Sequence, residues 1–234
     1  MSSFFDVPSD LQHSYAGLVA RHLEEALIPV AAGLVLALLI GQLCVRYAWV
    51  YPPVLWGTTI FYAIPSLAIF VILIDYTGQS QITVMIPLTL YSLVVLVPAI
   101  VDGVRAVPEE TQAAATAMGF GPWRRYLRVE LPIAVPAIFA GLRGATVASI
   151  SLVSVGALIG NQGALGNLLA DAMFYHRPML AVSSVVTTAV LAIAADLLLL
   201  LLRNVLTPWL PRGRTTAPAA EAAADARPAL ESAR

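Results

Sequence analysis

At 234 residues the chain is 59% hydrophobic and only 12% charged, whereas soluble domains are typically about 45–50% apolar and about 25% charged. This composition excludes an ordinary soluble domain. The formal net charge of −1 provides no general attraction to nucleic acid, so no nucleic-acid partner is expected. The apolar bias indicates a protein whose surroundings are membrane lipid.

Five stretches are long and apolar enough to cross a membrane, for which about 20 residues are needed. In chain order they are residues 26–45, 53–74, 82–101, 134–159 and 179–202. Lipid offers no hydrogen-bonding partner to an open strand or loop, so each stretch is expected to be a helix. The predicted fold class is therefore an all-α integral membrane bundle of about five transmembrane helices. Prolines that invite kinks lie in or near these stretches at Pro29, Pro65, Pro87, Pro98 and Pro136.

The distribution of arginine predicts the orientation of the bundle. One side of the membrane, the side of residues 105–132, receives Arg46, Arg105, Arg124, Arg125, Arg128, Arg203, Arg212 and Arg214. The other side keeps only Arg21 and Arg177. Because cytoplasmic loops carry the excess of positive charge, residues 105–132 are expected in the cytosol. Five crossings then place the N-terminal segment, residues 1–21, outside, and a cytoplasmic tail, residues 209–234, whose composition predicts disorder.

Residues 105–132, RAVPEETQAAATAMGFGPWRRYLRVELP, form a polar segment between the third and fourth apolar stretches. Pro108 suits the first turn of a helix, and Glu109 and Glu110 follow where the helix dipole favours negative charge. Strong helix formers continue up to Gly119, which suits the left-handed position just after a helix end. A short helix is therefore predicted from Pro108 to Gly119.

A second helical segment is expected to begin at Trp123 and to end at Pro132, so that both short helices lie along the membrane surface. The first of them has little side-chain bulk, because it contains Ala113, Ala114, Ala115 and Ala117. Such a helix suits seating in a groove on another protein. An interfacial helix that covers the floor of the bundle is the alternative; the pattern favours docking but leaves both interpretations open.

No constellation for catalysis is evident. The chain contains no lysine, so a phosphate-binding G-x-x-x-x-G-K-[ST] loop is impossible, and no G-x-S-x-G motif occurs. The histidines, expected outside or at the membrane interface, have no metal-ligand spacing: His13, His22 and His176. No catalytic residue, metal or cofactor is therefore predicted, and any ATP hydrolysis must occur on another chain.

One carboxylate lies within an apolar stretch. Asp196 is seven residues before Arg203 and so about 10 Å deep by helical rise. Intramembrane charges are costly and often functional. Two roles are open: a structural ion pair with an arginine such as Arg143, which lies within the fourth stretch, or the coupling of transport to protons.

The segment AAATAMGFGPWRRYLRVELP resembles the EAA loop of permease subunits in binding-protein-dependent ABC importers. The family pattern is Glu-Ala-Ala, three residues, Gly, nine residues, Ile, one residue and Leu-Pro. The positions that match in spacing are Ala114, Ala115, Gly119, Val129, Leu131 and Pro132. Two departures are present, since Ala113 occupies the position of the glutamate and Val129 that of the isoleucine.

The resemblance covers about residues 22–208 and extends to the permeases that import glycine betaine and other osmoprotectants. The segments that carry it are 63–70, 102–110, 157–169 and 195–208. Members of that group often read ALIGAGGLG where this chain reads ALIGNQGALG, so that Asn161, Gln162 and Ala164 are substitutions.

The resemblance implies a permease domain over residues 22–208, in a bacterial cell membrane, with a loop helix that docks on a cytoplasmic ATPase. The implied partners are a pair of ATP-binding subunits, a second permease subunit and an extracytoplasmic substrate-binding protein. The residues expected to couple the chain to the ATPase are Glu109, Glu110, Ala113, Ala114, Ala115, Gly119, Leu131 and Pro132. Glu109, Glu110 or Gln112 is expected to replace the motif glutamate.

The substrates implied are glycine betaine, choline, carnitine and proline-type osmoprotectants, with a different small solute as an alternative. A second alternative is an ion-coupled secondary transporter that uses Asp196, although the inverted repeats typical of that class are not evident. A small membrane enzyme lacks its catalytic residues. No substrate-binding residue is assigned, because aromatic residues in the second and third stretches suit packing or a quaternary ammonium ligand alike: Trp56, Phe61, Tyr62, Phe70 and Tyr91.

Overall fold

The computed structural model describes residues 9–159 and 163–209, and this part of the chain is helical without any strand. The α-helices are α1 (Ser9–Arg46), α2 (Tyr51–Ala63), α3 (Ser66–Thr77), α4 (Gln81–Arg105), α5 (Glu109–Ala117), α6 (Pro122–Arg125), α7 (Leu131–Gly156), α8 (Gly166–Phe174) and α9 (Pro178–Leu206). Short 3₁₀ turns, η2 (Ala48–Val50) and η4 (Ala157–Ile159), and a π-helical turn, η3 (Tyr126–Glu130), connect some of them. The predicted all-α fold class is confirmed.

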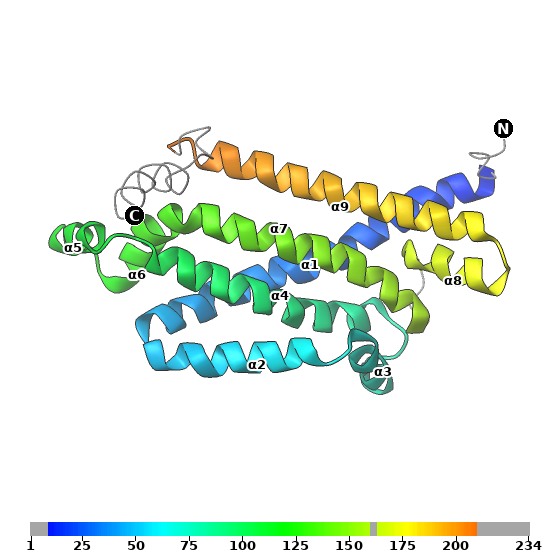
Figure 1. Cartoon of the computed structure of the whole chain (residues 1–234), viewed down its shortest axis with the longest axis horizontal. Helices are drawn as coiled ribbons and strands as arrows, with labels where there is room; N and C mark the ends of the chain where they lie inside the picture. The colour runs from blue at the N-terminus through cyan, green and yellow to red at the C-terminus, as the bar shows by residue number, and fades with distance from the viewer. Residues whose placement is uncertain (1–8, 160–162, 210–234) are drawn as a thin grey trace, which may run out of the picture.

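The long helices run side by side as an elongated bundle (Figure 1). Within the described residues, four helical segments are long and apolar enough to cross a membrane, and a bent pair of helices makes up to a fifth. Helices α5 and α6 lie at the end of the bundle where α9 finishes, whereas α3 and α8 lie at the opposite end (Figure 1). The polar segment 105–132 therefore projects from one end of the bundle.

Helix α4 occupies the centre, between α1 and α7, and has buried side chains along its whole length. Small residues let the backbones of these three helices come close together, which is how helices associate without a hydrophobic driving force in lipid. A methyl group added at Gly141 of α7 would lie 2.6 Å from Cβ of Ala99 on α4. Contact between α4 and α7 at this point thus depends on the absence of a side chain.

The second predicted span, residues 53–74, is not one helix. Helices α2 and α3 meet at an angle of 90° across Ile64 and Pro65. Ile64 is extended (φ −72°, ψ 129°), as expected for a residue that precedes proline, and its N–H bonds the carbonyl of Phe61 at 3.2 Å. Pro65 has no N–H with which to continue the helix, so the chain turns there.

Pro132 does not end a helix, which corrects the expectation for the second half of the polar segment. Helix α6, the turn η3 and α7 form one continuous helical rod from Pro122 to Ile159. In η3 the N–H of Leu131 bonds the carbonyl of Tyr126, five residues earlier. A regular α-helix would set the proline ring against the carbonyl of Arg128, and the wider π turn makes room for it.

The first helix begins earlier than the first apolar stretch. Helix α1 starts at Ser9, so residues 9–21 of the predicted N-terminal segment are already helical. His22, expected outside or at the interface, is fully buried, and its Nε2 lies 2.9 Å from the carbonyl oxygen of Ile150 on α7. Glu25 is fully buried one turn later. Hydropathy could not predict the burial of these two side chains, because it depends in part on packing against α7, which is distant in the sequence.

The close approach of α4 and α7 yields a prediction. We expect Gly141→Ala to destabilise the chain by about 1–3 kcal/mol, since neither Ala99 nor the α4 backbone can yield without moving the helix. Gly144→Ala is the matched control on the same helix, because a methyl group there would lie 3.8 Å from Val95, an ordinary van der Waals distance. The measurement is the thermal unfolding midpoint of each variant in detergent. Equal midpoints for the two variants would contradict the role of Gly141.

Candidate functional site

The part of the molecule that projects from the bundle is α5 (Figure 1). Pro108 is its N-cap, and Glu109 and Glu110 lie exposed in its first turn, where the helix dipole favours their charge. At the other end Gly119 has φ +81°, the left-handed conformation predicted for it. The N–H of Phe120 bonds the carbonyl of Ala115 at 3.1 Å, and that of Gly119 bonds Thr116 at 2.9 Å, which is a Schellman cap.

The exposed surface of α5 carries little side-chain bulk in its middle. Ala113 and Ala114 are exposed and follow the two glutamates on the helix, and Ala117 and Met118 are exposed at its far end. Ala115 is buried and forms the inner side of the helix. The surface therefore offers two carboxylates at one end, methyl groups in the middle and an exposed methionine at the other end.

Arg125 connects α5 to the rest of the bundle. Its Nη1 donates to Oγ1 of Thr116 on α5 at 3.1 Å, and its Nε donates to Oε1 of Glu130 at 2.6 Å. Glu130 is only 3% exposed, so this ion pair is partly shielded from water. Tyr126, also buried, donates from its hydroxyl to the carbonyl of Leu38 on α1 at 3.0 Å. These contacts join α5 to both α1 and α7.

Sequence reasoning missed this connection. An α-helical ion pair is expected at a spacing of three or four residues, whereas Arg125 and Glu130 are five apart. The π turn η3, which runs between them, brings the two side chains together. The signal in the sequence is Pro132, whose ring requires a wider turn just before it.

The residues predicted to couple the chain to an ATPase do not form one cluster. Glu109, Glu110, Ala113 and Ala114 share the exposed side of α5, while Ala115 and Gly119 shape the helix from within. Leu131 and Pro132 lie at the start of α7 and line an apolar groove formed with α1, the turn η3 and the end of α9. The groove also contains Leu34, Leu38, Leu127, Val135, Ile138, Leu206 and Trp209.

The structure brings Arg143 and Asp196 together. The guanidinium of Arg143 on α7 donates two hydrogen bonds to the carboxylate of Asp196 on α9, each of 2.6 Å. Such a bidentate pair is both strong and directional. The residues of α9 are exposed or half-buried in the single chain, apart from the buried Ser184, whose hydroxyl bonds the carbonyl of Leu165 at 2.7 Å. Specific polar ties of this kind hold α9 to the bundle.

No group of three or more potential metal ligands occurs among residues 9–159 and 163–209. The substitutions noted at Asn161 and Gln162 lie outside these described residues, as does the tail after residue 209. Ala164, the third of those substitutions, is buried.

An elongated bundle of apolar helices with a projecting loop helix defines a multi-pass membrane protein. Residues 32–212 match the binding-protein-dependent transport system inner membrane component family, so the chain belongs to that family. It is therefore a membrane permease subunit of an ABC transporter and not a catalytic enzyme. Membership disfavours the alternative of an ion-coupled secondary transporter.

Sequence similarity to curated relatives extends over most of the chain. It is 31% identical over 198 residues to the osmoprotectant import permease protein OsmW of Salmonella typhimurium, covering 82% of this chain and 92% of that protein. It is 27% identical over 188 residues to the glycine betaine/carnitine/choline transport system permease protein OpuCB of Bacillus subtilis, covering 80% and 86% respectively. An inward-facing structure of the MetNI methionine ABC transporter has the same fold, with a TM-score of 0.71, 19% identity and coverage of 88% of this chain and 100% of that chain.

We predict that the Arg143–Asp196 pair fastens α9. Asp196→Asn leaves the guanidinium of Arg143 without its ionic partner, so we expect a lower unfolding midpoint and faster proteolysis of α9. The double variant Arg143→Leu and Asp196→Leu removes both charges and should recover most of the loss. If the Asp196→Asn variant has the same unfolding midpoint as the unsubstituted protein, the pair does not hold α9 in place.

Proposed function

We propose that this chain forms half of the pathway of an ATP-driven importer and that α5 docks on a separate cytoplasmic ATPase. A second permease subunit completes the pathway, and an extracytoplasmic binding protein delivers the solute. Arginines at the α5 end of the bundle, among them Arg46, Arg105 and Arg203, support a cytoplasmic position for that end. The start of α1 then lies outside.

The exposed surface of α5 is the observation that carries the docking proposal. Its alanines allow the backbone to approach a partner closely, as in other complexes of a helix with a groove. Ala113 stands where the family has glutamate, and Glu109 and Glu110, four and three residues earlier, lie on the same side of the helix. Gln112 is a poorer substitute, because its Nε2 already donates to the carbonyl of Val107 at 3.1 Å.

Coupling requires that movement of α5 reach the spans. Arg125 connects Thr116 with Glu130, and Tyr126 connects the adjacent turn with α1. A displacement of α5 by closing ATPases is therefore expected to tilt α7 and α1 together as rigid bodies. The conformational change is driven because the closed ATPase pair binds one conformation of the permease more tightly than the other.

The proposed solutes are osmoprotectants of the glycine betaine, choline and carnitine type, with proline as a further candidate. The named relatives that transport glycine betaine, carnitine or choline support this class. These three solutes share one chemical group, a trimethylammonium cation. A permease pathway for them must accept a bulky positive charge that cannot donate a hydrogen bond.

Ala114→Trp tests the docking helix. The indole would stand on the exposed surface of α5 and prevent close approach, so we expect the ATPase to dissociate and ATP-driven uptake to fall at least about ten-fold, equivalent to about 1.4 kcal/mol of lost binding. Ala106→Trp is the matched control, since Ala106 is also exposed but lies before Pro108 at the base of the loop. Co-purification of the ATPase and uptake into proteoliposomes are the measurements. Retention of both by Ala114→Trp would refute docking through α5.

Uptake by the unsubstituted importer tests the solute class. The complex, reconstituted with its ATPase and binding protein, is offered radiolabelled glycine betaine, choline, carnitine and proline in turn. We expect ATP-dependent accumulation of at least one trimethylammonium solute. Failure of all four would remove the osmoprotectant assignment and leave membership of the permease family intact.

A further inference from the structure

The elbow between α2 and α3 lies within the depth of the membrane. Helix α2 has 13 residues and so spans about 20 Å. It begins beside Arg46 and the exposed Trp49, which suit the membrane surface. The hydrocarbon layer is about 30 Å thick, so the elbow at Ile64 and Pro65 falls inside it.

The elbow is also exposed in the single chain. Tyr62, Ala63, Ile64 and Pro65 are all exposed, and here the last carbonyls of α2 have no following turn of helix to bond them. Irregular backbone at this depth is tolerated only where protein covers it or where it borders a water-filled pathway. The elbow therefore faces the second subunit or the pathway between the subunits, and not lipid.

Three aromatic rings gather at the elbow. Tyr91 of α4 is 6% exposed, and its hydroxyl donates to the carbonyl of Ile64 at 3.3 Å, which ties α4 to the elbow. The ring of Tyr62 stands almost perpendicular to that of Tyr91, at 85° with centroids 5.6 Å apart. Phe61 lies on Tyr91 as well, with centroids 5.5 Å apart. Tyr62 is 52% exposed, so part of its ring is open to a partner even though its hydroxyl end extends toward α7.

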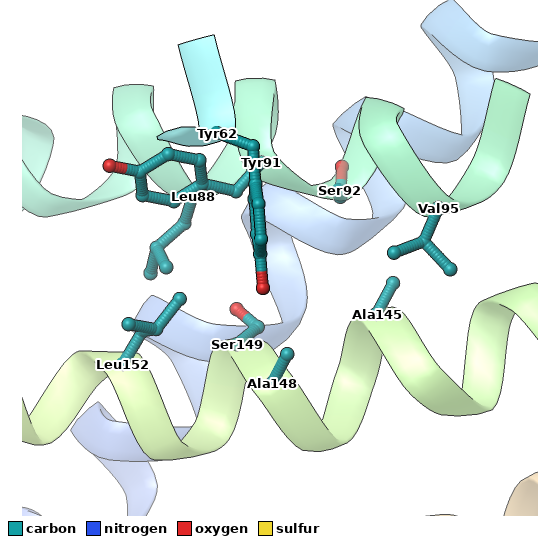
Figure 2. Close-up of a pocket in the computed structure, with 9 residues that line it drawn as sticks. All are labelled: Tyr62, Leu88, Tyr91, Ser92, Val95, Ala145, Ala148, Ser149 and Leu152. Carbon is teal, nitrogen blue, oxygen red and sulfur yellow. The ribbon is translucent and has the colours of Figure 1, made fainter. Parts of the chain in front are cut away.

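A small cavity adjoins this cluster (Figure 2). It has a volume of about 20 Å³ and lies where Ala148 and Ser149 of α7 face the ring of Tyr62. That volume holds a water molecule but not a trimethylammonium group. A cation of that size would therefore rest on the exposed side of the rings, at Tyr62, in the conformation described.

We propose that Tyr62, whose ring is positioned by its contact with Tyr91, forms a binding station for the quaternary ammonium group of the solute as it crosses this subunit; the inference rests on the proposed solute class. Aromatic faces attract such cations through the ring quadrupole. No carboxylate lines the cavity beside the cluster, so the attraction stays moderate and the solute can leave again. An aromatic face also binds a cation without a hydrogen bond, and a quaternary ammonium group has no N–H to donate.

Fluorination of the ring at position 62 separates attraction for a cation from packing. Each fluorine weakens the quadrupole of a phenylalanine ring while its size changes little. We therefore measure the maximal uptake of radiolabelled choline and glycine betaine, at saturating binding protein, by importers carrying Tyr62→Phe or mono-, di- and trifluorinated phenylalanine in place of Tyr62. The rate is expected to fall stepwise with the number of fluorines. Tyr62→Leu should lose between about two-fold and about thirty-fold.

Tyr76→Leu is the matched control, because Tyr76 is an exposed tyrosine at the far end of α3, away from the elbow. Uptake by the importer that carries this variant should be unchanged. Assembly of each variant with the ATPase is verified by size-exclusion chromatography. A flat fluorine series, in an importer whose unsubstituted form carries choline or glycine betaine, overturns the station alone. An unsubstituted importer that carries neither solute overturns the proposed solute class, and the station with it.

Discussion

A chain that crosses lipid must satisfy the hydrogen bonds of its own backbone, and the rest of this structure depends on that constraint. It explains why the described residues are helical and why their helices are long. It also makes the two irregular places informative. One is the elbow at Ile64 and Pro65, and the other is the π turn η3 before Pro132. Each lies next to a site for which we propose a function.

The two irregularities solve the same problem in different ways. At the elbow the chain accepts a proline by breaking the helix, and Tyr91 supplies a hydrogen bond to the carbonyl of Ile64. At η3 the helix continues, because a wider turn accommodates the ring of Pro132. The break creates an exposed corner lined with aromatic rings. The continuous rod instead gives α5 a stiff connection to α7, through Arg125 and Glu130.

Polar contacts, more than apolar packing, hold helix α9 against the bundle. Helix α4 is buried between α1 and α7, and close packing suffices there. Helix α9 has almost no buried side chain, and lipid is as apolar as its own surface, so burial provides little reason for it to stay. The ion pair between Arg143 and Asp196 and the hydrogen bond of Ser184 supply that reason.

The sequence by itself determined the class of fold, the approximate positions of the spans and the short helix from Pro108 to Gly119. These depend on hydropathy, helix-capping residues and motif spacing, all of which act over a few neighbouring residues. The same local signals placed Arg143 and Asp196 within the spans but could not say that the two side chains meet. They also suggested that Pro132 ends a helix, since proline usually does.

Only the tertiary structure decided how the prolines act and which polar groups meet. Pro65 breaks its helix and Pro132 does not, although both stand in apolar surroundings, because the neighbouring turns differ. His22 is buried because α7 covers it, and Tyr62 meets Tyr91 because the elbow brings α2 beside α4. Such contacts join residues from 29 to 128 positions apart, too distant for any local pattern to encode.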